Sequence, residues 1–368
     1  MRLSGNSAGK ALVLTCFGES HGPCVGAVLD GCPAGLPLTV DDIQVELDKR
    51  KPGLTAVSTP RKEEDQVEVL SGVFNGRTTG APICLTIRNR DAESEAYEQI
   101  KNKPRPGHAD LAAILKYGGF GDYRGGGRFS GRVTAAYVAA GAIAKKLLAT
   151  LGVEVLAHTV QIGKVKTVKD VSFDQVRENV YGNAVRCAVP ESAGLMEKEV
   201  AKAAEEGDSV GGVVEAVALN VPAGLGEPVF DSLDSDVAKM MFNVPAVKGV
   251  EFGAGFQAAS MRGSENNDAY AVQKGKVTSL TNNAGGIIGG LSTGMPIVVR
   301  VAFKPTSSIA KRQRTVNLEK MKESEIQVTG RHDPCIVPRA VPVVESCLAL
   351  VLADHALRAG KMPRVIKA

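Results

Sequence analysis

Two of the five histidines lie on turns bounded by glycine, where an imidazole can reach a ligand. His21 belongs to Gly18-Glu19-Ser20-His21-Gly22, and His108 belongs to the Arg-Pro-Gly-His-Ala-Asp segment at 105–110. Imidazole exchanges protons near neutral pH, so either histidine could serve as a general acid or base. A purely structural role in a tight turn is the alternative for each.

The 18–22 turn also matches the Gly-x-Ser-x-Gly pattern of a hydrolase nucleophile elbow. Only 17 residues precede the motif, and Pro23 and a strand-like run follow it instead of a helix. An elbow needs a strand before it and a helix after it, so the context disfavours this interpretation. A serine hydrolase that uses Ser20 therefore stays as the alternative function.

A second motif combines arginines with glycines at 122–132. Arg124, Arg128 and Arg132 recur every four residues and lead into a predicted helix. Cations oppose the dipole at a helix N-terminus, so helix stability does not explain them. Arginines and backbone N–H groups together favour an anion-binding site. A solvated loop and an RNA-binding segment are the alternatives, although an RNA-binding segment usually repeats such clusters.

Three further segments could hold or transform an anion. They are the glycine-rich run at 282–290, Lys304-Pro305-Thr306-Ser307-Ser308 after a predicted strand, and 330–334 (Gly-Arg-His-Asp-Pro) before the last helix. A lysine beside hydroxyls can hold a phosphate, whereas turn formation and helix capping are the structural alternatives. His158 and His355 lack a surrounding motif and are interpreted as structural, and no residue set has the spacing of metal ligands.

Composition narrows the class of protein. The chain has 368 residues, a net charge of +4, 4% aromatic residues and no Trp, which favours an anionic small molecule over nucleic acid as partner. Seven cysteines without a Cys-x-x-Cys motif indicate a reducing, cytoplasmic compartment. No signal peptide is predicted, and the longest uncharged, mostly apolar stretch, 133–144, is too short to span a membrane.

Periodicity predicts strands and helices that mix without regular βαβ alternation, which indicates an α+β fold. The predicted strands are 12–17, 25–30, 67–74, 82–88, 213–221, 247–252 and 296–303. The predicted helices are 40–50, 132–151, 232–242 and 341–358. The residues alone thus predict a cytoplasmic α+β enzyme with an arginine-rich pocket, acting on an anionic and phosphorylated substrate.

In this order the motifs resemble chorismate synthase. The resemblance runs from 18–22 through 105–110, 122–132, 245–251, 284–290 and 304–308 to 330–334, essentially the whole chain. It implies formation of chorismate from 5-enolpyruvylshikimate 3-phosphate by 1,4-trans elimination of phosphate, with reduced FMN and no net redox change. It also implies one domain over 1–368, a β-α-β sandwich with a helical core between antiparallel sheets, and a homotetramer.

The resemblance assigns roles to individual residues. His21 matches a general acid at the departing phosphate, and His108 matches a histidine that could protonate reduced flavin. Asp333 matches a carboxylate that helps to remove the carbon 6 proton, with Ser20 and Ser130 as assisting hydroxyls. The implied substrate-binding residues are Arg50, Arg61, Arg105, Arg132 and Arg331. The implied flavin-binding residues, some contributed by a neighbouring subunit, are Arg128, Phe129, Ser130, Pro245, Ala246, Gly289, Lys304, Pro305, Thr306, Ser307, Ser308 and Arg331.

Two positions depart from the family pattern. Phe129 stands where many members have Ser, and Ala56 stands where many have an Arg assigned to substrate or NADP. The sequence has no added domain or nucleotide fingerprint for flavin reduction. We therefore expect a monofunctional enzyme that obtains reduced flavin from an external flavin reductase, with NADPH only an indirect source of reductant.

Overall fold

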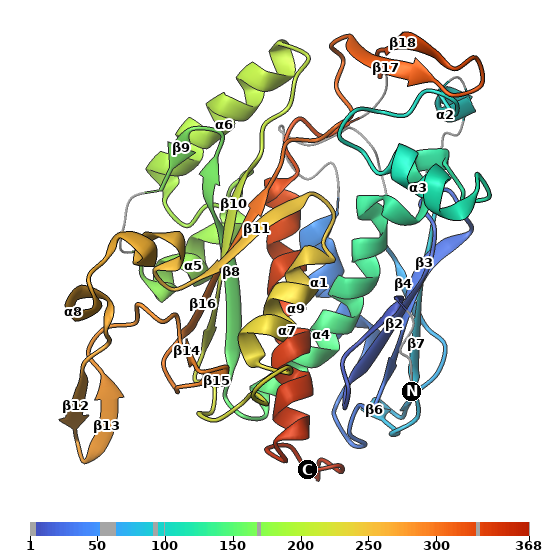
Figure 1. The fold of residues 1–368 in the computed structure, drawn as a ribbon. Coiled ribbons are helices and arrows are strands. Elements are labelled where there is room, and N and C mark those ends of the chain that lie inside the picture. The colour runs from blue at the N-terminus through green and yellow to red at the C-terminus, as the bar shows by residue number, and fades with distance from the viewer. Residues whose placement is uncertain are drawn as a thin grey trace.

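Two antiparallel sheets enclose a layer of helices (Figure 1). The structure is a computed structural model that describes residues 5–51, 64–90, 95–98, 100–167, 171–328 and 332–367. Helices α4 and α9 pack against each other, α4 also covers the first sheet, and α9 also covers the second. The predicted α+β fold with a helical core between antiparallel sheets is confirmed.

Each large sheet has five strands. The first contains, in spatial order, β1 (Ser7–Ala8), β2 (Val13–Gly18), β3 (Cys24–Asp30), β7 (Ile83–Arg88) and β4 (Val67–Val69). The second contains β11 (Val247–Phe252), β16 (Ile297–Phe303), β10 (Gly212–Leu219), β8 (Glu154–Ile162) and β9 (Val165–Lys166). The two-stranded pairs are β5 (Val73–Phe74) with β6 (Arg77–Thr78), β12 (Tyr270–Gln273) with β13 (Lys276–Ser279), β14 (Ile287–Ile288) with β15 (Leu291–Ser292), and β17 (Gln313–Asn317) with β18 (Lys322–Ile326).

The helices belong to the central layer or to the edges. They are α1 (Val40–Arg50), α2 (Glu95–Glu98), α3 (Asp110–Tyr117), α4 (Thr134–Ala149), α5 (Phe173–Asn179), α6 (Pro190–Glu205), α7 (Leu233–Phe242), α8 (Gly263–Asn266) and α9 (Val337–Arg358). Helices α1, α4, α7 and α9 form the layer between the sheets, and α3 lies beside the upper end of α4 (Figure 1).

Helices α4 and α9 approach closely because α4 is rich in small residues. A Cβ on Gly141 would lie 2.3 Å from the Cβ of Ser346, so the contact requires glycine there. Helix α9 is long and apolar enough to cross a membrane by length and composition, but 94% of that stretch is buried inside the protein. A helix that is apolar all round and buried by its neighbours is typical of a protein core.

The predicted bounds of α1 and β11 match the structure residue for residue, whereas two other predicted elements differ from it. The predicted strand at 67–74 is divided, since Gly72 has φ +83° and a Cβ there would lie 2.6 Å from Ile83 Cγ1. Helix α9 begins at Val337, four residues before its predicted start, with Pro338 in its first turn. Pro342 is therefore inside the helix, where it removes one backbone donor.

Candidate active site

The His21 turn connects the antiparallel strands β2 and β3, so it is a hairpin turn. Asn89 Nδ2 donates hydrogen bonds to the carbonyls of Glu19 (2.9 Å) and Gly22 (2.8 Å) and so fixes both ends of the turn. Ser20 is buried, and its Oγ has no hydrogen-bond partner among the described residues. Neither the strand–turn–helix context nor a serine–base hydrogen bond of a hydrolase elbow is therefore found in this described segment.

A glycine loop packs against both predicted catalytic histidines. A Cβ on Gly125 would lie 2.2 Å from His21 Cδ2, and one on Gly126 would lie 3.2 Å from His108 Nε2. Both glycines have positive φ (+59° and +81°). The Ser20 N–H also donates to the Gly127 carbonyl at 3.1 Å. Two turns more than 80 residues apart in sequence therefore meet at one loop, which only glycine can form.

His108 belongs to a compact charged cluster at the start of α3. Its Nδ1 is 2.5 Å from Asp110 Oδ1, while Arg105 Nε and Nη2 each donate to the same carboxylate at 2.8 Å. Burial opposes ionisation of Asp110, but hydrogen bonds from Arg105 and His108 hold the pKa of that carboxyl well below its usual range. The ring of Tyr97 packs edge-on against His21, with centroids 5.2 Å apart.

The segment 304–308 joins this cluster to Asp333. Arg105 Nη1 donates to Ser308 Oγ at 3.1 Å, and Ser307 Oγ donates to the Gly107 carbonyl at 2.8 Å. Thr306 Oγ1 donates to the backbone carbonyl of Asp333 at 3.2 Å. The hydroxyls of three consecutive residues thus hold together the His108 turn and the segment that precedes α9.

Lys304 lies at the end of β16, beside two other predicted flavin contacts. Its backbone N–H donates to the Ala246 carbonyl at 3.0 Å, and its Nζ donates to Ser307 Oγ at 2.9 Å. Pro245 directly precedes Ala246, which has φ +73°. Burial and the charge of nearby Lys248 lower the pKa of Lys304. Two cations this close indicate a place where an anion would be stabilised.

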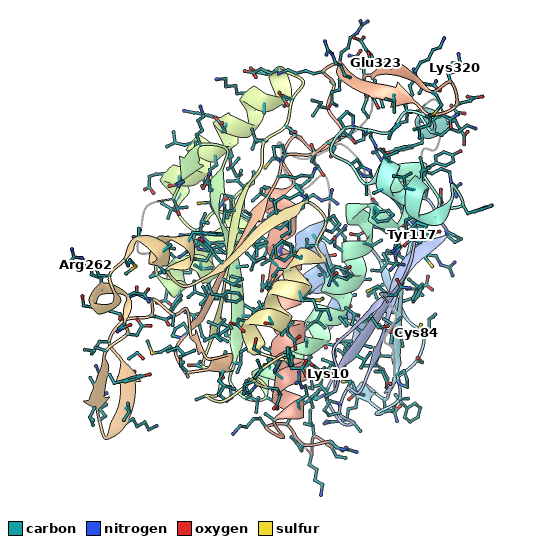
Figure 2. The ribbon with its side chains drawn as sticks, viewed as in Figure 1. Lys10, Cys84, Tyr117, Arg262, Lys320 and Glu323 are labelled. Carbon is teal, nitrogen blue, oxygen red and sulfur yellow. The ribbon has the colours of Figure 1, made fainter. Side chains whose placement is uncertain are left out.

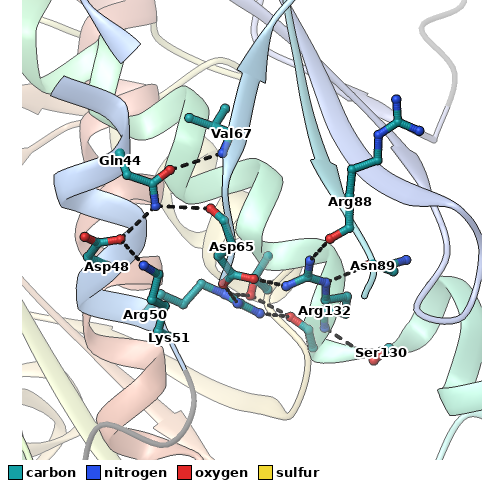
Figure 3. Close-up of polar contacts among 12 residues, drawn as sticks. Gln44, Asp48, Arg50, Lys51, Asp65, Val67, Arg88, Asn89, Ser130 and Arg132 are labelled. Atoms are coloured by element: carbon teal, nitrogen blue, oxygen red, sulfur yellow. Dashed lines mark hydrogen bonds and ion pairs between the residues drawn. The ribbon is translucent and has the colours of Figure 1, made fainter. Parts of the chain in front are cut away.

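Two of the predicted substrate arginines bind a buried carboxylate of the protein itself (Figure 3). Arg50 Nη1 donates to Asp65 Oδ2 at 2.8 Å, and Arg132 Nη1 donates to Asp65 Oδ1. Asp65 and both arginines are almost fully buried. Arg50 also donates to Thr134 Oγ1 (3.0 Å) and to a backbone carbonyl at 131 (2.9 Å). This Asp65 cluster fixes the orientation of both guanidinium groups.

The Asp65 cluster connects to both sides of the site. Arg132 Nε donates to Asn89 Oδ1 at 2.8 Å, and Asn89 holds the His21 turn. Arg339 Nη1 donates to Asp333 Oδ2 at 2.6 Å, and its charge also helps to lower the pKa of Arg50 and Asp65. For Arg50 the largest cause is burial, which Asp65 opposes. For Asp65 burial raises the pKa, but the charges of Arg50 and Arg132 outweigh it.

A partly apolar cleft of about 290 Å³ opens beside the histidine cluster. Its wall includes Tyr97, Arg105, Tyr117 and Gly126, together with the predicted flavin residues Arg128 and Phe129. Tyr117 lies at the end of α3 (Figure 2) and contacts the Phe129 ring at a centroid distance of 6.5 Å. Arg128 Nη2 donates to Asn6 Oδ1, and Ser130 Oγ accepts a hydrogen bond from the Arg132 N–H at 3.3 Å.

Gly289 is the predicted site residue that the fold separates from the rest. Its loop packs at the start of β16, where the Val298 N–H donates to the Gly285 carbonyl at 3.1 Å. Lys304 follows the other end of the same seven-residue strand, so the length of β16, roughly 20 Å, separates this loop from Lys304. Within one chain Gly289 cannot share a small site with Lys304. Arg61, Arg331 and Ala56 lie outside the described residues.

Sequence reasoning assigned no role to several residues that form the site: Asp65, Asn89, Tyr97, Asp110, His332 and Arg339. Asp110 and His332 could have been proposed from the sequence, because each lies next to a candidate residue in the same motif: Asp110 near His108, and His332 beside Asp333. Burial, with the charges of Arg105 and His108, lowers the pKa of His332, while Asp333 opposes the shift. Asp65 lies in a run of charged residues and gave no signal of its own.

The arginines at 122–132 do not form an exposed cationic surface in the described structure. Arg124 is bidentate to Asp122 (2.9 and 2.8 Å), Arg128 contacts Asn6, and Arg132 is buried on Asp65. This geometry disfavours an RNA-binding segment. Among the residues with defined positions, no three His, Cys, Asp or Glu side chains are grouped as metal ligands would be.

Two histidines at a shared glycine loop, surrounded by fixed arginines and buried carboxylates, define an acid–base enzyme for an anionic substrate. The family model of chorismate synthase matches residues 12–357. The chorismate synthases of Dehalococcoides mccartyi and Korarchaeum cryptofilum are each 56% identical to the chain, over 98% and 97% of its length and 99% and 98% of theirs. A crystal structure of chorismate synthase superposes with a TM-score of 0.77 at 35% identity, covering 96% of this chain and 93% of the other.

The chain therefore belongs to the chorismate synthase family. This membership places it among the lyases that form chorismate in the shikimate pathway, and the serine-hydrolase alternative has no support.

Proposed function

We propose that the chain converts 5-enolpyruvylshikimate 3-phosphate to chorismate by 1,4-trans elimination of phosphate, with reduced FMN bound and no net redox change. The observation that carries this proposal is the packing of His21 and His108 against the adjacent glycines Gly125 and Gly126. A trans elimination needs an acid at the leaving group and a base at the proton that is lost. Two proton-exchanging rings at one loop, with a carboxylate nearby, supply such groups.

His21 is the proposed acid at the departing phosphate. The Asn89 side chain clamps both ends of its turn, so the backbone that carries the imidazole is fixed. The buried Ser20 Oγ beside it has no protein partner within the described chain, so it is available to a ligand. Ser130, which caps the turn before α4, is the second proposed assisting hydroxyl.

Asp333 is the proposed carboxylate for removal of the carbon 6 proton. Arg339 holds its Oδ2 at 2.6 Å, and the Thr306 hydroxyl holds its backbone carbonyl at 3.2 Å. The side chain is only 7% exposed, so water competes little for its oxygens. A fixed and desolvated carboxylate is suited to take a proton from carbon.

The arginines are proposed to bind the two carboxylates and the phosphate of the substrate. Arg105 is directed by Asp110. Arg50 and Arg132 are held by Asp65, with each guanidinium nitrogen bonded to the protein, so they would act on the substrate through their charge. Fixed guanidinium groups need little reorganisation when charge develops on the leaving phosphate. Arg61 and Arg331 complete the proposed set.

The described residues fit a flavin mononucleotide. The aromatic wall of the cleft suits a flat ring, and the half-buried Lys304 with the hydroxyls at 306–308 suits its phosphate. Bound reduced flavin supplies an electron-rich ring that can share electron density with the substrate while phosphate leaves. Phe129, Arg128 and Ser130 would hold the ring side, and Pro245, Ala246 and Lys304 to Ser308 the phosphate side. Gly289 would then contact the flavin of a neighbouring subunit.

We also propose that the chain acts as one catalytic domain over 1–368, as a cytoplasmic homotetramer that receives reduced flavin from an external flavin reductase. One continuous core of buried residues supports the single domain. Large exposed apolar side chains support assembly, among them Phe230 (92% exposed), Phe256 (82%) and Val272 (74%).

The experiment is anaerobic incubation with 5-enolpyruvylshikimate 3-phosphate under four conditions: no flavin, oxidised FMN, dithionite-reduced FMN, and FMN with NADPH. We expect chorismate only with chemically reduced FMN. Chorismate without flavin would contradict the cofactor assignment. Equal rates with NADPH would contradict the external reductase and leave the lyase assignment intact.

A further inference from the structure

The His108 ring contacts two charged neighbours in different ways. Asp110 Oδ1 is 2.5 Å from Nδ1, in hydrogen-bonding range of that nitrogen. Arg105 Nη2 is 3.2 Å from Nδ1 and 3.4 Å from Nε2, so the guanidinium lies nearly equidistant from the two ring nitrogens. A group that is equidistant from both nitrogens does not select one of them for the proton. Asp110 is therefore the neighbour that can decide the tautomer.

The chemistry of the contact between His108 and Asp110 determines which tautomer of His108 forms. An ionised carboxylate can only accept a hydrogen bond, so Nδ1 must carry the proton that it shares with Asp110. In the neutral ring Nε2 then has the free lone pair. That nitrogen faces the glycine loop, where a Cβ on Gly126 would lie 3.2 Å away. Nε2 therefore lies beside Gly126, which is itself part of the wall of the cleft.

We propose that Asp110 is a positioning residue that holds the His108 proton on Nδ1 and so presents Nε2 as the atom that gives and takes a proton in the site. The proposal rests on the proposed function only for the identity of the bound group that exchanges a proton with Nε2. The balance of the step is simple: the imidazolium releases its Nε2 proton to the bound group and returns to the neutral Nδ1–H ring. Asp110 stays ionised throughout, because Arg105 binds both of its oxygens.

The surroundings of His108 are defined on each packed side. Arg105 and Asp110 flank it on its own turn, Gly126, which has no side chain, lies beside the Cε1–Nε2 edge of the ring, and His332 approaches from the segment before α9. Of the ionisable groups that these sides present, Asp110 provides the carboxylate at hydrogen-bonding distance.

The chain contains a matched control for this arrangement. At the other end of α9, His355 Nε2 is 2.9 Å from Asp236 Oδ2, and Arg358 Nη1 is 3.4 Å from the same oxygen. The same three residue types meet there, but the His355 ring is buried, and no glycine of the described residues approaches it as Gly126 approaches His108. Asp236→Asn makes the same chemical change as Asp110→Asn at a place with no proposed chemistry.

The first test reads the tautomer directly. The chain is labelled with 15N-histidine, and ring spectra are recorded at pH about 8.5, above the usual imidazole pKa of about 6.5. His108→Gln assigns the signal among the five histidines. We expect the protonated-type shift on Nδ1 in the wild type, with loss of that preference in Asp110→Asn and no change at His108 in Asp236→Asn. The same Nδ1–H ring in Asp110→Asn would overturn the proposal.

The second test separates action through His108 from action through Arg105. Asp110→Asn should lower kcat about 100-fold or more, as expected for a general acid–base group with the wrong proton placement. In the His108→Gln background the same substitution should change kcat by less than about two-fold, because its partner is already absent. Full additivity of the two losses would overturn the proposal, since Asp110 would then act through Arg105 or the fold. A comparable kcat loss in Asp236→Asn would also overturn it.

The tautomer spectra need no turnover. A wild type that makes no chorismate would therefore contradict the proposed function, while the Asp110 assignment would still be decided by the spectra.

Discussion

The described part of the chain contains two clusters built from the same three residue types, Asp, His and Arg, and we propose that they serve different purposes. In the cluster of Arg105, His108 and Asp110, the histidine side chain is 20% exposed and its second nitrogen faces a glycine loop. In the cluster of Asp236, His355 and Arg358, the histidine is 1% exposed. Its second nitrogen, Nδ1, is buried and has no hydrogen-bond partner within the described chain. A histidine is poised for chemistry only when its second nitrogen is open to a ligand.

The elements that carry the clusters explain the difference. His355 belongs to the last turns of α9, which packs between α7 and the central helix α4. His108 precedes a short helix at the rim, and the loop beside it has no side chains at Gly125 and Gly126. Along α9 the start of the helix, next to the Asp333 segment, and His355 are roughly 30 Å apart. The two clusters can therefore be altered independently.

The largest expected effect is on turnover when the histidines themselves are replaced. His108→Gln should lower kcat by about 100-fold to 10,000-fold, with little change in stability, because a general acid–base group is lost. His355→Gln should leave kcat unchanged and reduce the free energy of unfolding by about 1–3 kcal/mol, because the buried ring and its hydrogen bond to Asp236 are lost. Steady-state kinetics and urea denaturation measure both. Equal effects of the two substitutions on kcat would remove the distinction.

The next largest effect is expected on stability, when Asp65 is replaced. This carboxylate binds two arginines and no histidine. Asp65→Asn leaves Arg50 and Arg132 buried without a counter-charge, so it should reduce the free energy of unfolding by about 3–5 kcal/mol. Urea denaturation of the holoenzyme measures the loss. Asp48→Asn on the same helix α1, where the side chain is 50% exposed, is the control and should change stability far less. A loss below about 1 kcal/mol for Asp65→Asn would show that the cluster is not held as described.

The glycine loop should be sensitive to a single methyl group. In Gly125→Ala the new Cβ would fall 2.2 Å from His21 Cδ2 and 2.8 Å from Ser20 Oγ, so the ring must move. We expect kcat to fall about 10-fold to 100-fold, since displacement by about 1 Å has effects of this size. Gly152→Ala is the control, because Gly152 also has positive φ (+73°) but its Cβ would meet no atom within 4 Å. It should show the backbone strain alone, about 1–2 kcal/mol in stability, and unchanged kcat.

The smallest expected effect is a change in how stability depends on pH. Asp110 has a lowered pKa in the folded protein, so its contribution is present above the usual unfolded value of about 3.9 and is lost as pH falls through the folded value. In Asp110→Asn the free energy of unfolding should therefore fall less steeply as the pH drops below about 4. Near pH 7 its slope against pH should change little. Urea denaturation at a series of pH values measures this. An unchanged acid slope would mean that Asp110 is not held ionised by its neighbours.

Much of the fold could be predicted because its signals are local. Helix α1 has Thr39 as N-cap, acids in its first turn and bases in its last, and its predicted bounds are those observed. The hairpins β12–β13 and β17–β18 could not be predicted, since their strands are only four or five residues long and largely exposed, so no buried apolar face marks them. Strand β8 was missed because the buried His158 and Thr159 interrupt its apolar pattern.

The candidate site shows the same contrast between residues marked by a local sequence signal and residues that are not. His21, His108 and the glycine loop could be proposed from the sequence because each lies in a short motif with unusual residues. The partners that orient them were not found, because their contacts join distant positions: Asp65 meets Arg132 across 67 residues, and Arg105 meets Ser308 across 203. Such pairs depend on how β7, α4 and α9 pack, which no local pattern reports.

The most direct test of the central claim is the stoichiometry of one reaction. Enzyme loaded with reduced FMN is mixed anaerobically with limiting 5-enolpyruvylshikimate 3-phosphate, and phosphate and chorismate are quantified in the same quenched samples. An elimination at the His21–His108 loop predicts equal amounts of both products at every time, with both absent in His108→Gln over the same interval. Phosphate without chorismate, or equal yields in His108→Gln, would contradict it.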